Sequence, residues 1–373
     1  MELLNLNLFL PLNLIVEQVG DIELNIDSIS YDSRKTMPGS LFIAIRGTKT
    51  DGNNYIEEAR HSGSVAFATD NPDAYRKYSN VFKAAILTID IRLFLAAVSA
   101  LFFGNPSREL KLVGVTGTNG KTTITRLIYD ALRKLNVKSG VVGTIGCEID
   151  GRYCEINNTT PESIDLNEIF YDMSRSGIEV CCCEVSSHSI HFNRVAFIDF
   201  SIGVFVNLTQ DHLDFHTNMD DYFRCKSSFF FDKNRFRVER SIINIDDEYG
   251  KKIFEGLKND VYSMSISRNA DFSAENISID ESGFRATFNI AGRKFNINSR
   301  LKGKFNIYNT LAAAASSVLL GYDPEQICEK LEDANYVPGR FEPIDTGRGF
   351  MVIVDYAHTP DGLLNNKYSE ENN

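Results

Sequence analysis

Short apolar runs separated by turn-rich stretches mark the first part of the chain. They cover Ser40–Ile45, Val65–Ala68 and Ala84–Ile89. Apolar runs of this length, bounded by residues that favour turns, predict β-strands, because helices need longer periodic segments. We therefore expect residues 1–107 to form a small α/β domain.

From residue 108 the pattern becomes an alternation of apolar strands and helices. The run Leu112–Thr116 is followed by Thr122–Leu135, whose apolar residues fall on one helical face. Further apolar runs of strand length are Gly140–Ile145, Val180–Val185, Ser201–Val206 and Ser241–Ile245, and an alanine-rich helical segment is Asn306–Leu320. Continuous apolar strands separated by helices indicate a mostly parallel sheet that is covered on both faces. We predict a central α/β domain over residues 108–342.

A third region begins near residue 343. It contains the apolar strand Met351–Asp355 and then a polar tail without an apolar period. Such a tail cannot build a core, so we expect residues 343–373 to be the start of a third domain that is largely absent. A strand without its sheet is marginal, so we expect Met351–Asp355 to be poorly supported.

Composition narrows the classes of function. Of 373 residues, 43% are hydrophobic and 24% are charged, the balance of a soluble globular protein with two or three domains. The formal net charge of −11 argues against general binding to nucleic acid or acidic membranes. The start of the chain has no basic segment and is too short and interrupted to be a signal peptide or a membrane span. The seven cysteines, three of them consecutive, fit reduced thiols, so we expect a cytoplasmic protein.

A glycine-rich segment, Gly114–Thr123, lies between a predicted strand and a predicted helix. In this context backbone N–H groups and a helix N-terminus bind phosphate oxygens, which predicts a nucleotide site. Lys121 would reach the outer phosphates and the Thr122 hydroxyl would ligate Mg²⁺. The strict spacing of the phosphate-loop motif requires glycine at the position where this chain has Val115. The alternative to a nucleotide site is a glycine-rich turn with a chance Lys-Thr pair.

Acidic and imidazole side chains follow two of the other strands. Glu184 ends one predicted strand, and the segment Asn207–His216 after another holds two Asp and two His. Carboxyl ends of parallel strands meet at the ligand crevice, so these groups are placed to bind metal. The alternatives are a structural ion pair for Glu184, a solvated loop for the second segment, and an ordinary solvated charge for Lys226 further along.

The loop Gly117–Thr123 resembles that of the Mur ligase family, which also includes folylpolyglutamate synthetases and cyanophycin synthetases. Other segments resemble the tripeptide synthetases of this family: Asp32–Arg34, Pro38–Phe42, Gly47–Gly52, Asn158–Pro161, Glu184–His188, Asp211–His216, Gly303–Leu311, Pro338–Glu342 and Asp355–Asp361. The folylpolyglutamate and cyanophycin enzymes share the loop but not this combination.

The resemblance implies a fold and an activity. The fold would be a small UDP-binding α/β domain, a central phosphate-loop ATPase domain and a Rossmann-like third domain, the last largely absent here. The activity would be ATP-dependent ligation of a third amino acid, diaminopimelate or lysine, to UDP-N-acetylmuramoyl-L-alanyl-D-glutamate in peptidoglycan biosynthesis. An acyl phosphate would be the intermediate, ATP a substrate and Mg²⁺ the cofactor, at two sites.

Several alternatives stay open at this point. The chain alone would be weakly active or inactive if the third domain is needed. It would then be a non-catalytic binder of nucleotide and UDP-sugar, or half of a split ligase completed by a second chain. A ligase of the folylpolyglutamate or cyanophycin kind is the remaining alternative.

The resemblance also implies roles for individual residues. The catalytic residues would be Lys121, His212 and Lys226, the last as a carbamate; the metal ligands would be Thr122, Glu184, His212 and Lys226. The ATP-binding residues would be Gly117, Thr118, Asn119, Gly120, Lys121, Thr122, Thr123, Asn306, Asn309, Arg340 and Asp355. The residues that bind the UDP-muramoyl-peptide would be Ser33, Thr48, Lys49, Thr50, Thr159, Thr160, Ser186 and Arg194. Phe192 departs from the family pattern, in which a glutamine is often found at its position, and Asn306 has a further interpretation as a helix N-cap.

Overall fold

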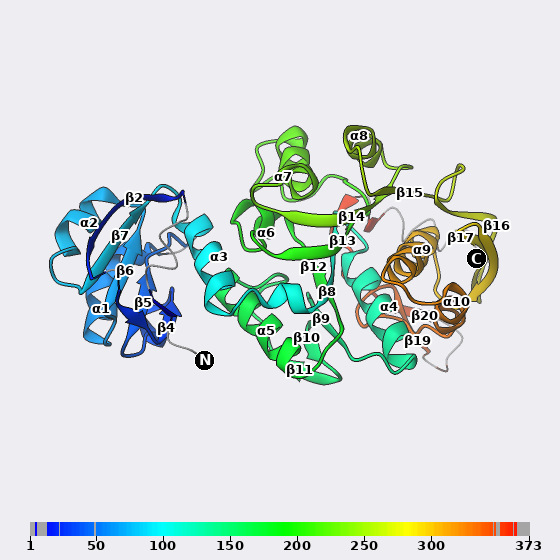
Figure 1. Ribbon diagram of the computed structural model, residues 1–373. Coiled ribbons are helices and arrows are strands. Elements are labelled where there is room, and N and C mark those ends of the chain that lie inside the picture. The colour runs from blue at the N-terminus through cyan, green and yellow to red at the C-terminus, as the bar shows by residue number, and fades with distance from the viewer. Residues whose placement is uncertain are drawn as a thin grey trace. The chain divides into compact units, whose positions relative to one another are not determined.

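The computed structural model describes residues 4–5, 13–21, 23–47, 50–345, 347, 351–360 and 362–363. The chain divides into two compact units (Figure 1). The first unit consists of Met1–Pro106, Pro161–Tyr171 and Phe192–Ile198, and the second of Ser107–Thr160, Asp172–His191 and Asp199–Asn373.

The first unit is built around a five-stranded sheet in the order β2-β7-β6-β5-β4. Its strands are β2 (Ile15–Gly20), β4 (Ser28–Ser30), β5 (Ser40–Ile43), β6 (Ala66–Thr69) and β7 (Ala84–Thr88), and a separate pair is formed by β1 (Leu4–Asn5) and β3 (Asn25–Ile26). Only β2 runs antiparallel to its neighbour in the five-stranded sheet. The three apolar runs predicted as strands are therefore confirmed as β5, β6 and β7.

Helices and alternating side chains give this sheet two apolar faces. The helical segments are η2 (Ser33–Lys35), η3 (Gly52–Tyr55), α1 (Ile56–His61), α2 (Pro72–Tyr78) and α3 (Ile91–Phe102), and α5 (Ser163–Arg175) begins in this unit. On β5, Leu41 belongs to one buried cluster with Phe94 of α3. Phe42, the next residue, belongs to a second cluster with Ile56 of α1, because successive side chains of a strand point to opposite faces.

The second unit contains an eleven-stranded sheet in the order β11-β10-β9-β12-β8-β13-β14-β15-β16-β17-β18. Its strands are β8 (Lys111–Thr116), β9 (Ser139–Gly143), β10 (Gly146–Ile149), β11 (Arg152–Cys154), β12 (Val180–Glu184), β13 (Asp199–Phe205), β14 (Arg237–Asn244), β15 (Val261–Ser265), β16 (Phe272–Asp280), β17 (Gly283–Ile290) and β18 (Arg293–Ser299). The seven neighbouring strands β9-β12-β8-β13-β14-β15-β16 are parallel. Antiparallel strands extend the sheet at both ends, β10 and β11 at one and β17 and β18 at the other. The predicted mostly parallel central sheet is confirmed.

The helical segments of this unit are η4 (Pro106–Glu109), α4 (Lys121–Lys134), α6 (Ser187–His191), α7 (Met219–Phe231), α8 (Glu248–Gly256), α9 (Lys304–Leu319) and α10 (Pro324–Glu332). The apolar face of α4 and the alanines of α9 share one buried cluster with the central strands. No helix in the described part of the chain has both the length and the apolar character to cross a membrane.

Two local expectations were wrong. The helix expected from Asn306 begins earlier, at Lys304, with Gly303 as its N-cap, so Asn306 lies inside the first turn. The strand expected over Gly140–Ile145 ends at Gly143 and turns back into β10.

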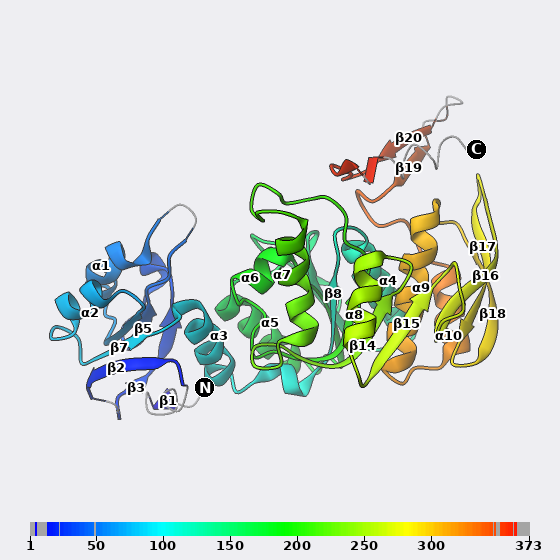
Figure 2. The same ribbon diagram turned by 90° about the horizontal axis from the view of Figure 1, so that it is seen from above.

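The strand expected at Met351–Asp355 is β20 (Met351–Val354), and it is not alone. It pairs in antiparallel register with β19 (Glu342–Asp345), and the two strands lie together in Figure 2. The expectation of a strand without a partner is therefore wrong, because β19 carries too few apolar residues to be recognised in the sequence.

Candidate active site

The glycine-rich loop connects β8 to α4 in the second unit. Gly120 is the N-cap of α4 and has a φ of 91°, a left-handed conformation that glycine adopts without strain. A Cβ atom added there would lie 2.6 Å from Oδ1 of Asn309. The loop therefore needs glycine at this position, and the predicted ATP residue Asn309 on α9 lies directly against the loop.

Asn207, just after β13, holds the loop in shape. Its Oδ1 accepts hydrogen bonds from the backbone N–H groups of Thr118 (3.1 Å) and Asn119 (2.9 Å). The Thr118 hydroxyl donates to the carbonyl of Thr209 (3.2 Å). Asn207 was not predicted to have a role, although it opens the segment that holds the two Asp and two His residues.

Two lysines point at the same part of the loop. Nζ of Lys121 donates to the carbonyl oxygens of Gly117 (2.8 Å) and Thr118 (2.7 Å). Lys226 on α7 is 1% exposed, and its Nζ donates to the Gly117 carbonyl as well (3.0 Å), with the Thr116 hydroxyl at 3.5 Å. Burial lowers the pKa of both lysines, that of Lys226 furthest, and the charge of Lys121 lowers the pKa of Lys226 further.

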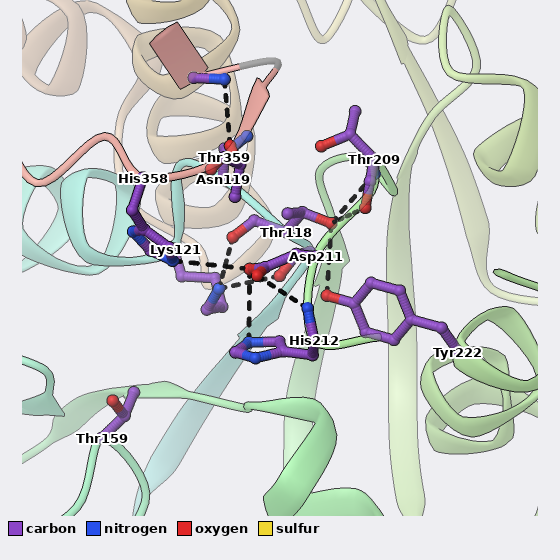
Figure 3. Close-up of polar contacts among 12 residues, drawn as sticks. Thr118, Asn119, Lys121, Thr159, Thr209, Asp211, His212, Tyr222, His358 and Thr359 are labelled. Atoms are coloured by element: carbon purple, nitrogen blue, oxygen red, sulfur yellow. Dashed lines mark hydrogen bonds and ion pairs between the residues drawn. The ribbon is translucent and has the colours of Figure 1, made fainter. Parts of the chain in front are cut away.

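Asp211 is the centre of a small group of charged and imidazole side chains (Figure 3). Its carboxylate accepts a hydrogen bond from the backbone N–H of His212 (2.8 Å). Its Oδ2 lies 3.4 Å from Nε2 of His212 and 3.8 Å from Nε2 of His358. Burial lowers the pKa of His212, and the charge of Asp211 opposes this shift. At neutral pH His212 is therefore a neutral imidazole, the form that binds a metal.

Glu184 lies at the end of β12 and is 1% exposed. Its Oε1 accepts from the backbone N–H of Thr144 (2.7 Å) and its Oε2 accepts from the Thr144 hydroxyl (3.1 Å). Gly143 makes room for this carboxylate, since a Cβ atom there would lie 2.2 Å from Oε1. Thr144 was not predicted as a site residue, because it belongs to no motif and lies in the tight turn between β9 and β10.

Arg340 reaches the start of α4 from the segment that precedes β19. Its Nη2 donates to the Thr122 hydroxyl (2.9 Å), and its guanidinium lies 4.9 Å from the ring centre of Tyr356. Asp355, expected near ribose, accepts from the backbone N–H of Phe341 (3.0 Å). These contacts bring the predicted phosphate ligand Arg340 to the loop.

The remaining predicted ATP residues lie around the same loop. Thr123 is buried on α4, and Nδ2 of Asn309 donates to Oδ1 of Asn306 (3.0 Å). Nδ2 of Asn306 in turn donates to the carbonyl of Lys302 (2.7 Å). The two asparagines therefore form one fixed polar pair beside Gly120.

The residues predicted to bind the UDP-muramoyl-peptide divide between the two units. In the second unit, the Thr160 hydroxyl donates to the carbonyl of Glu184 (2.7 Å) and accepts from the N–H of Ser186 (3.3 Å), and the Thr159 hydroxyl lies 3.2 Å from that of Thr144. These three residues surround Glu184.

The others belong to the first unit. Ser33 is buried in η2, Thr50 is exposed, and Nε of Arg194 lies 3.3 Å from Oε2 of Glu162. Thr48 and Lys49 lie outside the described residues.

The donor set fits a hard divalent cation. Glu184 is fixed by Thr144, and the Thr122 hydroxyl lies at the start of α4; carboxylate and hydroxyl oxygens are ligands that Mg²⁺ accepts. Lys121 is within electrostatic reach of Glu184, Asp211 and Arg340, so these groups share one neighbourhood. Among the described residues, no three His, Cys, Asp or Glu side chains gather as a metal site of their own. A metal here would also use hydroxyl, modified-lysine or ligand oxygens.

The model of the Mur ligase middle domain matches residues 115–317, and that of the Mur ligase family catalytic domain matches residues 25–102. The UDP-N-acetylmuramoyl-L-alanyl-D-glutamate–2,6-diaminopimelate ligase of Caldanaerobacter subterraneus subsp. tengcongensis is 42% identical over 346 residues, covering 93% of this chain and 70% of that protein.

Solved structures show the same fold. A UDP-N-acetylmuramoyl-L-alanyl-D-glutamate–2,6-diaminopimelate ligase superposes with a TM-score of 0.83 at 24% identity, over 100% of this chain and 74% of that one. The MurF ligase of Thermotoga maritima in complex with ADP superposes with a TM-score of 0.63 at 19% identity, over 92% and 74%. With both domain models and a relative at 42% identity in agreement, the chain belongs to the Mur ligase family.

Proposed function

We propose that this chain is an ATP-dependent ligase that joins 2,6-diaminopimelate to the terminal carboxylate of UDP-N-acetylmuramoyl-L-alanyl-D-glutamate in peptidoglycan biosynthesis. The observation that carries the proposal is the loop between β8 and α4, where Lys121 folds back on the carbonyls of Gly117 and Thr118 and Arg340 donates to the Thr122 hydroxyl. The choice of substrates is supported by the name of the relative from Caldanaerobacter, of whose length this chain spans 70%.

We propose that the three regions predicted from the sequence have different roles. Residues 1–107 would bind the UDP-sugar, residues 108–342 would bind ATP, and residues 343–373 would belong to a third region. Within the first two regions, the residues proposed to hold the UDP-muramoyl-peptide are Ser33, Thr48, Lys49, Thr50, Thr159, Thr160, Ser186 and Arg194. We propose no second polypeptide as a partner.

In the first step the substrate carboxylate would attack the γ-phosphorus of ATP. A P–O bond forms to the carboxylate oxygen, the bond to ADP breaks, and an acyl phosphate results. Two anions must approach, so the step depends on positive charge placed around the transferred group. Backbone N–H groups at the start of α4, from Gly120 to Thr122, would bind phosphate oxygens, because those of Thr118 and Asn119 donate to Asn207. Lys121 and Arg340 would neutralise the outer phosphates.

Adenosine would lie beside the same loop. Asn306 and Asn309 are proposed to contact adenine, because Asn309 lies against Gly120 at the entrance to α4. Asp355 is proposed to contact ribose, from a position beside the segment that carries Arg340.

Magnesium, when bound, would neutralise phosphate charge. We propose two ions, held by Thr122, Glu184, His212 and Lys226 together with phosphate oxygens. Lys226 is proposed to carry a carbamate, because an ammonium repels a divalent cation whereas a carbamate supplies anionic oxygen. Burial beside Lys121 favours the neutral amine that reacts with CO₂.

In the second step the amine of 2,6-diaminopimelate would attack the carbonyl carbon of the acyl phosphate. A C–N bond forms, the C–O bond to phosphate breaks, and one proton leaves the nitrogen. The products are the amide and inorganic phosphate. Thr159 and Ser186 lie beside Glu184. In this position they would orient the muramoyl-peptide toward the phosphate loop.

The test is an assay of the chain with UDP-N-acetylmuramoyl-L-alanyl-D-glutamate, ATP, Mg²⁺ and either 2,6-diaminopimelate or lysine. Mass spectrometry of the UDP-sugar product and release of ADP and phosphate are the measurements. We expect the diaminopimelate adduct and none with Lys121→Ala. Binding of both nucleotides without any product would favour a non-catalytic binder, and product only with a folate or polyaspartate acceptor would favour the other ligases that share the loop.

A further inference from the structure

Two cysteines face each other across the hairpin formed by β10 and β11. Cys147 on β10 and Cys154 on β11 are directly opposed in the antiparallel register. Both are free thiols, Cys147 buried and Cys154 half-buried. Directly opposed residues have Cβ atoms about 4.5–5.5 Å apart, and a disulfide needs about 4 Å. Closing the bond would require only a small movement of the two strands.

We propose that Cys147 and Cys154 form a reversible disulfide, a modification site separate from the phosphate loop. The hairpin that carries them ends in the turn at Asp150 and Gly151, both with positive φ, so its register is fixed by a tight turn. The two sulfur atoms are therefore kept opposite each other in the reduced protein.

The other thiols do not compete for Cys147. Cys183 lies in the same row of the sheet, because both Cys147 and Cys183 are register partners of Val142. Val142 lies on the strand between them, so the two cysteines are two strand spacings apart, about 10 Å, which a disulfide cannot span. Cys225, the second half-buried cysteine, donates its thiol to the carbonyl of Ser187 instead (3.3 Å).

The chemistry is thiol–disulfide exchange with a small disulfide such as oxidised glutathione. The more exposed Cys154 would attack first, forming a mixed disulfide and releasing one glutathione. Cys147 would then attack the sulfur of Cys154, closing the internal bond and releasing the second glutathione. Each attacking thiol loses its proton, and each departing glutathione thiolate takes one up. Burial and the neighbouring Cys154 raise the pKa of Cys147, which places its attack second.

The position gives the bond structural consequences. β10 begins two residues after Thr144, the residue that fixes Glu184, and β11 leads into the segment that contains Thr159. Thr144 and Thr159 contact each other through their hydroxyls. The disulfide would link β10, which follows Thr144, to β11, which precedes Thr159.

The experiment treats the whole chain with oxidised glutathione under native conditions, blocks remaining thiols and maps peptides by mass spectrometry. We expect one linkage, Cys147 to Cys154, the loss of two titratable thiols, and full reversal by dithiothreitol. Cys147→Ser should leave a stable glutathione adduct on Cys154, and Cys154→Ser should leave Cys147 as a free thiol.

The matched control is Cys225→Ser, which removes the other half-buried thiol and should leave the linkage intact. A stable glutathione adduct on Cys154 in the unmutated chain would overturn the proposal. So would a linkage of Cys147 to Cys183, or full retention of both thiols. Folded state is monitored by circular dichroism, so that a linkage seen only after unfolding also counts against it.

Discussion

Lys121 and Lys226 donate hydrogen bonds to the same acceptor, the carbonyl oxygen of Gly117, over 2.8 and 3.0 Å. Two ammonium groups on one oxygen repel each other, and the burial of Lys226 adds a desolvation cost. Burial is the main cause of the lowered pKa of both lysines. For Lys226, the repulsion by Lys121 is the second cause. Such an arrangement is relieved when an anion enters between the lysines or when one of them loses its charge.

Carbamylation of Lys226 would provide that relief. With ¹³C-labelled bicarbonate and nucleotide, we expect a carbamate carbon signal that is absent in Lys226→Ala. Loss of a proposed metal ligand should lower ligase activity by more than the roughly 10- to 100-fold that is typical for a residue that only orients a ligand. Lys233→Ala is the matched control, because Lys233 also has a pKa lowered by burial and donates to a backbone carbonyl, that of Val238.

The control variant should keep both the signal and the activity. A plain amine at Lys226 in CO₂-saturated, nucleotide-bound protein, seen by mass spectrometry and in an electron density map, would refute the carbamate.

Lys121→Ala should abolish turnover while the fold is kept. The Lys121 ammonium donates to the loop carbonyls of Gly117 and Thr118 and takes no part in the apolar core, so its loss leaves the core intact. Removing one group that stabilises charge in a transition state typically costs about 10²- to 10³-fold in rate. The measurements are ADP release and circular dichroism, with Lys251→Ala on the exposed face of α8 as the control. Equal rates of ADP release in the two variants would show that Lys121 does not act at the phosphate site.

The parts of the site that the sequence predicts are those encoded by neighbouring residues. The loop with Lys121 and Thr122 follows from strand, glycines and helix in a row. Thr144 and Asn207 have no such local signal, because each acts on a residue far along the chain, Glu184 and the loop respectively. Their roles arise from the order of strands in the sheet, which places β9 beside β12 and β13 beside β8.

The same distinction holds for the fold. Fully buried strands such as β12 stand out as continuous apolar runs, and all its residues are buried. The strands β16 to β18 were not predicted, because exposed and buried residues alternate or mix along them. The start of α9 was misplaced because Gly303, with a φ of 87°, caps the helix through its backbone alone.

Thr144→Val should weaken the response to magnesium. The substitution removes the hydroxyl that donates to Oε2 of Glu184 and leaves the backbone N–H that donates to Oε1. Groups that orient a metal ligand typically contribute about 10- to 100-fold in metal affinity. We expect the Mg²⁺ concentration for half-maximal activity to rise by about 10-fold.

Thr144→Ser keeps the hydroxyl and is the matched control, with a magnesium response close to that of the unmutated chain. Gly143→Ala should be more damaging than Thr144→Val, because its Cβ would lie 2.2 Å from Oε1. Identical magnesium titrations for the valine and serine variants would show that the hydroxyl does not position Glu184.

His216 should make the protein less stable in mild acid. Its side chain is 2% exposed, it stacks on Tyr222 with 4.8 Å between ring centres, and its Nε2 has no hydrogen-bond partner among the described residues. Burial lowers its pKa from the usual 6.5, with Asp221 opposing and Lys226 adding to the shift. The unfolded chain therefore binds a proton here before the folded protein does. As the pH falls below about 6.5, stability is lost until the lowered folded pKa is passed.

His216→Phe keeps an aromatic ring against Tyr222 and removes the titrating nitrogen. The free energy of unfolding, measured with urea between pH 7.5 and 5, should fall less steeply in this variant than in the unmutated chain. The difference in slope is at most about 1.4 kcal/mol per pH unit, the value for one proton. His61→Gln, on the exposed end of α1, is the control and should keep the original slope. If His216→Phe also keeps the slope of the unmutated chain, the acid sensitivity belongs to other groups. The buried imidazole would then be charged or solvated in the folded protein.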